Sequence, residues 1–308
     1  MSMNLEYCPL CEGTEFRELF SASDPHYGIP GTHRIVRCRL CSLVFLDPMY
    51  SDAELAAFYG MISTEYFAYQ DHLQQNSGKE FLKRVLGYCA GTKDPAFERP
   101  GAVLDLGCGT GWFLQRMRAR GWQAFGVEVS REAAKMGRES HGLEIFNGTL
   151  QQANFPSQFF DYVRSNHSFE HLSCPDATLE EIRRILKPNG KLFIGVPNID
   201  GLYSRIFRQH WWHLAAPLHT FGYSKRTLSE FLAKHGFRVE KVSYNSDYFG
   251  LVGSLQIWLN RNTGGTSMQG SLVNFHPVRL LCQWATNCVD LAGQGDAMEV
   301  IGVKVESR

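Results

Sequence analysis

This chain of 308 residues is organised around the stretch Val103-Leu104-Asp105-Leu106-Gly107-Cys108-Gly109-Thr110-Gly111. Its branched apolar residues predict a buried strand at 102–106, and the glycines predict a sharp turn followed by a helix that ends near Gly121. Glycine allows such a turn because it has no Cβ, and it can bring the backbone close to a ligand. Asp105 stands at the carboxyl end of the strand, where open α/β sheets bind their ligands.

Strand-like and helix-like segments alternate after this turn. Ser130 and Ser224 can cap helices at their start, and Gly142 and Gly236 can end them. Strands are expected at 123–127, 143–146, 159–165, 191–196, 237–244 and 299–306, and helices at 130–141, 174–186, 224–235 and 275–291, with an exit turn at 187–190. This alternation predicts an α/β fold with a doubly wound, mostly parallel, Rossmann-like sheet of seven strands over residues 101–308.

Four of the nine cysteines form two close pairs, Cys8/Cys11 and Cys38/Cys41, separated by 26 residues. Two Cys-x-x-Cys pairs supply the four thiolates of a tetrahedral zinc site, and such a site is closed to substrate and therefore structural. The alternative is four buried free cysteines, because free cysteine behaves as a small apolar residue. We expect a zinc-ribbon-like lobe at 1–50. Because no export signal precedes the first pair, a reducing, cytoplasmic compartment is expected.

Residues 51–100 join this lobe to the sheet. A short helix is expected through Phe58, and an amphipathic helix is expected at 79–89. Tyr59 and Tyr66 belong to an aromatic cluster between these two helices. They either pack the two parts of the chain together or form a lid over a ligand, and the residues favour neither reading.

The charge balance argues against a polyanion as partner. Lys and Arg together number 31, as do Asp and Glu, so the net charge is zero. Nucleic-acid-binding domains usually show a basic excess or a basic patch. No apolar run in the sequence reaches about 18 residues, the minimum expected of a membrane-spanning helix. The composition therefore suggests neither a nucleic-acid partner nor a membrane-spanning helix, while the oligomeric state stays open.

The spacing of the glycines separates several classes of ligand. A phosphate-binding Walker loop needs Gly-Lys-Ser/Thr, but Gly111 is followed by Trp112. A dinucleotide fingerprint is Gly-x-Gly-x-x-Gly, whereas this chain has Gly-x-Gly-x-Gly after Asp105. Glu128 ends the second strand, 23 residues after Asp105, and can accept hydrogen bonds from both hydroxyls of a ribose. An NAD enzyme would share that last feature.

Taken in order, the motifs resemble those of class I S-adenosylmethionine-dependent methyltransferases. They are Val-Leu-Asp-Leu-Gly-Cys-Gly-Thr-Gly, Gly-Val-Glu, Phe-Asp-Tyr-Val, Glu-His-Leu and Ile-Leu-Lys-Pro-Asn-Gly-Lys-Leu, and they cover about residues 101–240. The paired cysteines, followed by Cys-Ser-Leu-Val-Phe-Leu-Asp-Pro, resemble the zinc-binding segment of sugar- and antibiotic-modifying methyltransferases. S-adenosylmethionine and a structural zinc ion are the cofactors that this resemblance implies.

The resemblance also implies a set of cofactor-binding residues. The first strand end and the glycine turn would face the methionine part, and the second strand end would hold the ribose. The next two strand ends would border the adenine and the sulfonium, and two tyrosines would form a lid. In that order, the residues are Asp105, Gly107, Cys108, Gly109, Glu128, Thr149, Leu150, Asn166, Tyr59 and Tyr66.

Candidates for the catalytic residues cluster after the fourth strand. An acceptor that is a hydroxyl or a carbon acid must lose a proton, and neutral histidine takes up a proton near pH 7. His167, Glu170 and His171 lie in this segment, and His219 lies in a Trp/His-rich insertion at 198–223 that we expect to cover the substrate. The same side chains could instead hold a second metal ion, or Glu170 and His171 could only fix the loop. The inverted zinc-protease pattern His-x-x-Glu-His is rejected, because here it spans a strand end and a loop.

The sequence thus predicts transfer of a methyl group to an oxygen or carbon of a small or medium acceptor. A sugar or sugar-linked metabolite is the first choice, by the resemblance of the cysteine-rich segment. One alternative is an RNA or protein methyltransferase that docks its substrate on the zinc lobe. Another is a non-catalytic protein that binds S-adenosylmethionine.

Overall fold

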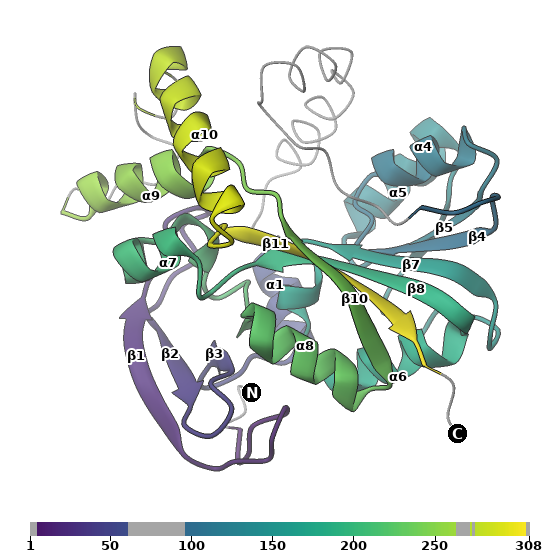
Figure 1. Cartoon of the computed structure of the whole chain (residues 1–308), viewed down its shortest axis with the longest axis horizontal. Coiled ribbons are helices and arrows are strands. Elements are labelled where there is room, and N and C mark those ends of the chain that lie inside the picture. The colour runs from purple at the N-terminus through teal and green to yellow at the C-terminus, as the bar shows by residue number, and fades with distance from the viewer. Residues whose placement is uncertain (1–4, 61–95, 263–271, 273–274, 306–308) are drawn as a thin grey trace.

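The computed structural model describes residues 5–60, 96–262, 272 and 275–305, and these residues form two sheets. The larger sheet has seven strands in the order β10-β11-β8-β7-β4-β5-β6, and the smaller has four in the order β1-β2-β3-β9. In Figure 1 the first three strands of the smaller sheet lie at the lower left, and the larger sheet extends to the right.

The seven-stranded sheet confirms the predicted architecture. β4 to β8 pair in parallel, and β11 lies antiparallel between β8 and β10. All five residues of the interior strand β4 are buried, as expected for a parallel strand covered on both faces. The last strand begins and ends two residues before its predicted position. The bounds are Ala102–Leu106 for β4, Gln123–Glu128 for β5, Glu144–Asn147 for β6, Phe160–Asn166 for β7, Leu186–Pro197 for β8, Phe237–Tyr244 for β10 and Ala297–Lys304 for β11.

Helices cover both faces of this sheet, with α4 and α5 above it and α6 and α8 below it in Figure 1. Their ends follow the predicted caps. At the start of α5 the Ser130 hydroxyl accepts a hydrogen bond from the Ala133 N–H at 3.3 Å, and Gly142 ends this helix with a φ of 60°. Ser224 and Thr227 form a capping box at the start of α8. The bounds are Trp112–Arg118 for α4, Arg131–His141 for α5, Pro175–Ile185 for α6 and Lys225–Lys234 for α8.

The prediction that a turn separates α6 from the next strand is wrong. The segment 187–190, expected to be an exit turn, lies within β8. The pairing of β8 with β7 is irregular at this point, and Asn189 has a φ of 59°. A positive φ bends a chain of L-residues sharply. The extra residues therefore bulge from the strand while pairing continues on either side.

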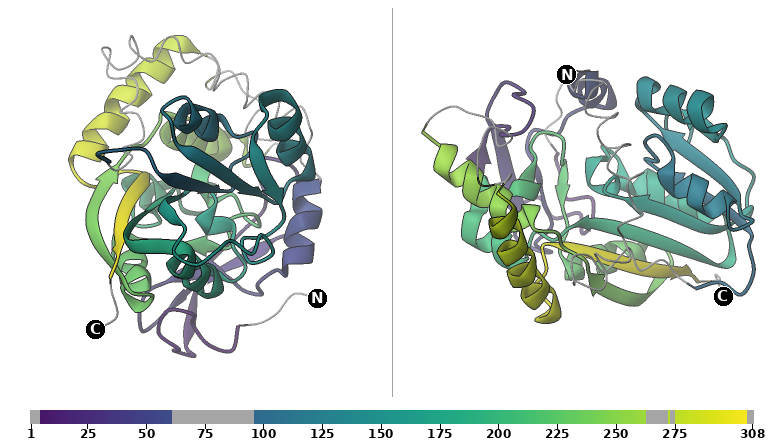
Figure 2. Two further views of the ribbon diagram at one scale, coloured as in Figure 1. Left: turned by 90° about the vertical axis from the view of Figure 1, so that its right-hand side faces the viewer. Right: turned by 90° about the horizontal axis from the view of Figure 1, so that it is seen from above.

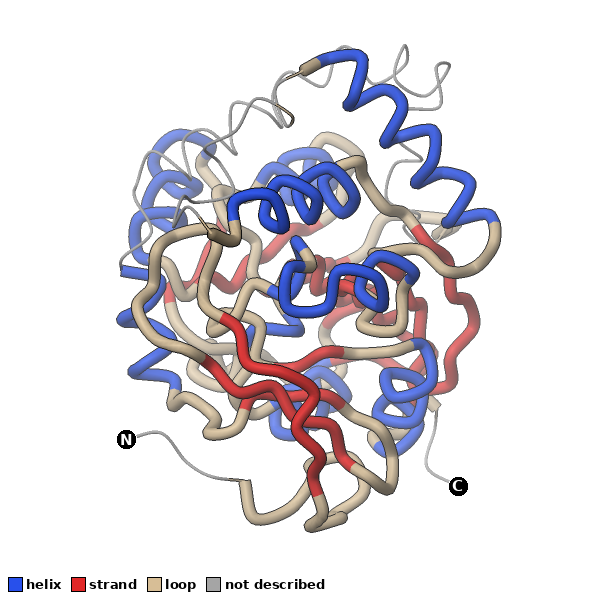
Figure 3. Tube along the Cα trace, turned by 90° about the vertical axis from the view of Figure 1, so that its left-hand side faces the viewer, coloured by secondary structure: helices blue, strands red, loops and turns tan. Residues whose placement is uncertain are grey.

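The N-terminal sheet takes its last strand from far along the chain (Figure 3). β9 belongs to the insertion at 198–223, yet it pairs antiparallel with β3. The Phe45 ring centroid lies 5.0 Å from that of Phe16 and 6.3 Å from that of Phe221, so aromatic packing joins the first, third and last strands. Neither β1 nor β9 was predicted from the sequence. The bounds are Phe16–Ala22 for β1, His33–Cys38 for β2, Val44–Leu46 for β3 and Phe221–Gly222 for β9.

The remaining helices include α7, α9 and α10, which pack together at one end of the molecule (Figure 2). α9 was not predicted because apolar residues occupy all its sides. Gly253 of α9 lies so close to Trp212 that an added Cβ would come within 2.1 Å of the indole. The bounds are Asp52–Gly60 for α1, Leu202–Phe207 for α7, Phe249–Asn260 for α9 and His276–Leu291 for α10, with 3-10 helices at Phe169–His171 (η2), Arg208–His210 (η3) and Trp212–Leu214 (η4).

Some predictions fall outside the described residues. These are the helix at 79–89, the residue Tyr66 and the side chain of Tyr59. Within the described ranges, no helix combines the length and the apolar character needed to cross a membrane.

Candidate active site

The turn after β4 needs glycine at its three positions for two different reasons. Gly107, Gly109 and Gly111 all have positive φ, at 71°, 55° and 85°. A Cβ added at Gly107 would lie 2.4 Å from Ser168 Cβ, and one added at Gly111 would lie 2.3 Å from Leu143 Cδ1. At Gly109, no described atom would lie within 4 Å of the added Cβ. Packing therefore requires the outer two glycines, while the middle one borders open space that a ligand can enter.

Glu128, at the end of β5, holds this turn in place. Its Oε2 accepts a hydrogen bond from the Gly109 N–H at 2.8 Å, and its Oε1 accepts one from the Ser130 N–H at 2.8 Å. Burial raises the pKa of the Glu128 carboxyl above its usual value. An ionised carboxylate has about four lone-pair sites, so both oxygens can still accept hydroxyl groups. Glu128 thus lies next to the open space at Gly109, and its contact with a ribose stays a prediction.

Asp105 is paired with a residue that the sequence analysis did not name. Its Oδ1 accepts a hydrogen bond from Arg164 Nη1 at 3.0 Å, and both side chains are buried. The two residues stand directly beside each other in the parallel pairing of β4 and β7, and the guanidinium carbon lies 4.3 Å from the centre of the Phe113 ring. Burying Asp105 requires such a partner, because an unpaired buried charge is strongly destabilising. Only the register of the two strands reveals this partner.

Thr149 and Leu150, the residues predicted to border the adenine, follow β6. The Thr149 N–H donates to Gln152 Oε1 at 2.9 Å, while Leu150 is buried in the core. Two apolar side chains near these strand ends were missed by the sequence analysis: Val129 is 53% exposed and Phe146 is 39% exposed. They stand at the ligand-binding edge of a parallel sheet, so they are candidates for contact with a flat apolar ligand group.

The segment after β7 carries the predicted catalytic residues. Asn166 and His167 both lie against Gly195 of β8. An added Cβ at Gly195 would come within 2.4 Å of Asn166 Oδ1, and the His167 N–H donates to the Gly195 carbonyl at 2.8 Å. Glu170 is 1% exposed, with its Oε1 3.5 Å from His167 Nδ1 and 3.8 Å from His219 Nε2. Among the described residues, neither carboxylate oxygen of Glu170 has a hydrogen-bond partner.

The imidazole rings of His171 and His219 each direct Nδ1 toward a backbone carbonyl oxygen. His171 Nδ1 lies 3.0 Å from the Leu218 carbonyl oxygen, and His219 Nδ1 lies 2.7 Å from the His213 carbonyl oxygen. Because a carbonyl oxygen can only accept, each Nδ1 carries a hydrogen. Burial lowers the pKa of His171 to about 4 and that of His219 to about 3. Both rings are therefore neutral near pH 7, with a lone pair on Nε2.

The end of the insertion holds this cluster together. The Thr220 N–H donates to the Glu170 carbonyl at 2.8 Å, and the Thr220 hydroxyl lies 2.7 Å from the Leu172 carbonyl oxygen. The Thr220 carbonyl accepts from the Leu46 N–H of β3 at 3.0 Å. A continuous hydrogen-bonded path therefore joins the N-terminal lobe, the insertion and η2. This path holds the insertion that carries His219 against the segment that carries Glu170 and His171.

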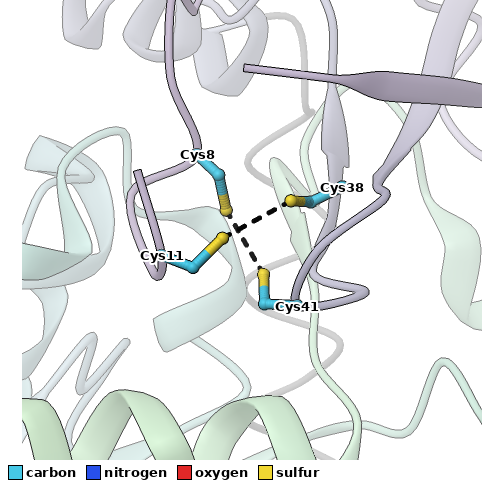
Figure 4. A group of neighbouring side chains, drawn as sticks. All are labelled: Cys8, Cys11, Cys38 and Cys41. Carbon is cyan, nitrogen blue, oxygen red and sulfur yellow. Dashed lines mark hydrogen bonds between the residues drawn. The ribbon is translucent and has the colours of Figure 1, made fainter. Parts of the chain in front are cut away.

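The four predicted metal-binding cysteines also converge, and Figure 4 shows their side chains pointing toward a common centre. The sulfur atoms of Cys8 and Cys41 lie 3.4 Å apart, and those of Cys11 and Cys38 lie 3.5 Å apart. Zinc–sulfur bonds of about 2.3 Å in a tetrahedron place sulfur atoms about 3.8 Å apart. The residue after each cysteine pair has a positive φ, at 60° and 70°, so both knuckles turn in the same way. This arrangement fits a tetrahedral zinc ion.

The sheet order, the glycine turn after β4 and the acidic residue ending β5 together define the fold of the class I S-adenosylmethionine-dependent methyltransferases. The family described as "Methyltransferase domain" matches residues 69–242, more than half of the 308 residues, and the chain belongs to this family.

Two curated relatives show how far the sequence similarity extends. The malonyl-[acyl-carrier protein] O-methyltransferase of Erwinia pyrifoliae is 30% identical over 142 residues, which are 45% of this chain and 49% of that protein. The demethylmenaquinone methyltransferase of Listeria welshimeri is 30% identical over 121 residues, which are 35% of this chain and 51% of that protein. The chain thus spans about half the length of the curated relatives it matches.

Similarity among solved structures supports the fold. A chain in the complex between the Haloferax volcanii Trm112 methyltransferase activator and a putative methyltransferase aligns with a TM-score of 0.53 and 20% sequence identity. The alignment covers 79% of this chain and 96% of that chain. At this identity the similarity concerns the fold alone.

Proposed function

We propose that this protein transfers a methyl group from S-adenosylmethionine to an oxygen or carbon of a small or medium acceptor. The observation that carries the proposal is the open space at Gly109, directly beside the buried carboxylate of Glu128. A ligand that fills this space meets backbone amides on one side and an acceptor for ribose hydroxyls on the other. Family membership supplies the reaction class.

The cofactor would lie along the carboxyl edge of β4, β5, β6 and β7. Glu128 would accept the ribose hydroxyls, and the exposed Val129 and Phe146 would contact the adenine together with Thr149 and Leu150. The methionine part would lie against the glycine turn, whose first strand is fixed by the Asp105–Arg164 pair. The remaining proposed contacts are Gly107, Cys108, Gly109, Asn166, Tyr59 and Tyr66.

S-adenosylmethionine supplies a methyl group on a good leaving group, so the protein must position the acceptor and remove its proton. Among the four candidates we assign proton removal to His167, because its side chain is 46% exposed. Partial desolvation opposes protonation of His167, but the Glu170 carboxylate outweighs this effect and raises the histidine's pKa above its ordinary value. Glu170 thereby orients His167 and stabilises its charged form after proton uptake.

The four cysteines would hold a structural zinc ion that stabilises the N-terminal lobe. This lobe supports a sugar or sugar-linked metabolite as the acceptor, through its resemblance to the zinc-binding segment of sugar-modifying methyltransferases. The lobe reaches the cluster after β7 through the pairing of β3 with β9. This pairing supports the proposal that the lobe forms one wall of the acceptor site.

Calorimetric titration with S-adenosylmethionine tests the cofactor site. We expect Glu128→Ala to lower affinity about 10- to 100-fold, because a hydrogen bond to a charged acceptor is worth about 1.5–3 kcal/mol. Glu132→Ala is the matched control, since Glu132 is an exposed acid of α5. If Glu128→Ala, checked for folding by circular dichroism, binds like the control, the ribose assignment is wrong. Release of S-adenosylhomocysteine with sugar nucleotides, RNA or proteins then identifies the acceptor class.

A further inference from the structure

The buried carboxylate of Glu170 has no hydrogen-bond partner among the described residues, and His167 Nδ1 lies 3.5 Å from its Oε1. Its Oε1 lies 3.8 Å from His219 Nε2, and the ring centroid of His219 lies 4.5 Å from that of His171. One ligand atom from each of these three residues lies within 4.8 Å of the others. Two imidazoles and one carboxylate therefore gather around a single small volume.

The hydrogen positions on the His171 and His219 rings make the grouping with Glu170 energetically unfavourable in the absence of a cation. The carbonyls of Leu218 and His213 fix a hydrogen on Nδ1 of His171 and of His219, so each Nε2 carries a lone pair. A lone pair on His219 Nε2 thus faces an oxygen of Glu170 that has no hydrogen-bond partner among the described residues. His167 compensates this carboxylate only when its ring is protonated, and burying an uncompensated carboxylate is strongly unfavourable. A cation placed between the ligand atoms removes this conflict.

We propose that Glu170, His171 and His219 bind a divalent transition-metal ion, at a second site separate from the four cysteines. Bonds of about 2.1 Å place neighbouring ligand atoms about 3.0–3.4 Å apart, so the side chains need to close by about 1 Å. Imidazole nitrogen suits zinc, iron or nickel better than it suits manganese, magnesium or calcium. The ion belongs to this first-row group.

The surroundings of the three ligands match what such an ion requires. A ligating histidine usually donates its other ring N–H to a carbonyl or a carboxylate, which fixes the ring and makes the free nitrogen more basic. Both rings meet this requirement. Thr220 adds a backbone support, because it joins the Glu170 and Leu172 carbonyls to the insertion that carries His219. The ligands thus come from two segments that are already held together.

A site with three protein ligands leaves coordination positions open. These positions lie next to the carboxyl end of β7, where Asn166 and His167 border the proposed methyl-transfer site. The ion would bind the acceptor oxygen and make its hydroxyl more acidic. This role rests on the proposed function, whereas binding of the ion does not.

Metal stoichiometry of the full-length protein tests the site directly. After incubation with zinc, cobalt, nickel or ferrous ions and gel filtration, elemental analysis should find two equivalents in the parent and one in His219→Ala and Glu170→Gln. His276→Ala is the matched control, since His276 is exposed at the start of α10 and should leave two equivalents. Cobalt distinguishes the sites, because only the cysteine site gives intense sulfur-to-metal charge-transfer absorption.

Two outcomes would overturn the proposal. One is a parent that retains a single equivalent of every ion tested, with only the thiolate spectrum of cobalt. The other is a second equivalent that persists in both site variants. Circular dichroism checks their folding, and His171→Gln repeats the test should His219→Ala fail to fold. Titration with S-adenosylmethionine is run in parallel, so loss of cofactor binding with intact metal content would count against the proposed function and leave the metal site standing.

Discussion

Alanine placed at Gly107 and, separately, at Gly109 will distinguish packing from ligand binding at the glycine turn. Both positions have positive φ, at 71° and 55°. An L-residue in this region costs about 1–2 kcal/mol. At Gly109 no further cost arises, because no described atom lies within 4 Å of the new Cβ. At Gly107 the new Cβ would lie 2.4 Å from Ser168 Cβ. The shift that relieves this overlap adds about 1–3 kcal/mol.

We therefore expect the free energy of unfolding to fall by about 2–5 kcal/mol in Gly107→Ala and by about 1–2 kcal/mol in Gly109→Ala. Urea denaturation followed by circular dichroism measures both values. Calorimetric titration of folded Gly109→Ala with S-adenosylmethionine should show at least about a tenfold loss of affinity. The physical reason is that the methyl group occupies space the cofactor would need.

The matched control is Gly142→Ala, because Gly142 also has a positive φ of 60° but caps the end of α5 instead of belonging to the turn. It should lose about 1–2 kcal/mol of stability and keep full cofactor affinity. Ser168→Gly in the Gly107→Ala background should recover the part of the loss caused by the overlap. Equal affinity of Gly109→Ala and Gly142→Ala would refute the assignment of the open space. Equal stability of Gly107→Ala and Gly109→Ala would refute the packing argument.

Three other outcomes are expected. Burial raises the pKa of Glu128 above 4.5, and protonation of this carboxylate removes an acceptor for the ribose hydroxyls. The affinity for S-adenosylmethionine should therefore fall as the pH drops through the raised pKa. Calorimetry over this pH range would show a constant affinity if Glu128 did not contact the ribose. Thr220→Val should lower the free energy of unfolding by about 1–3 kcal/mol, because the carbonyls of Glu170 and Leu172 lose the Thr220 hydroxyl as hydrogen-bond donor. The control is Thr14→Val at an exposed position, which should leave the free energy of unfolding in urea unchanged. Cys38→Ser should release zinc and lower the melting temperature, and unchanged zinc content by elemental analysis would contradict the four-cysteine site.

Much of the seven-stranded sheet was predictable because its signals are local. Apolar runs such as the one at 102–106 and caps such as Ser130 and Gly142 act within a few residues of the chain. Alternation of strands and helices then leaves few ways to form a parallel sheet. The bulge at 187–190 was read as a turn because the local signal for a bend is the same inside a strand and after a helix.

The candidate site was predictable only in part. Glu128 and the glycine turn could be placed from spacing, since both follow strands of one parallel sheet. Arg164 could not, because its pairing with Asp105 depends on the register of two strands separated by a long stretch of chain. Val129 and Phe146 were missed because exposure of an apolar side chain is a property of the folded surface.

By itself, the sequence determined the fold class, the glycine turn with Glu128 beside it and the paired cysteines, because each depends on residues close together in the chain or on a repeated pattern. Only the tertiary structure decided that β9 joins β3 and that His219 meets Glu170. The physical reason is that these contacts join distant segments. Packing of Phe45 against Phe221 and the hydrogen bonds of Thr220 bring them together.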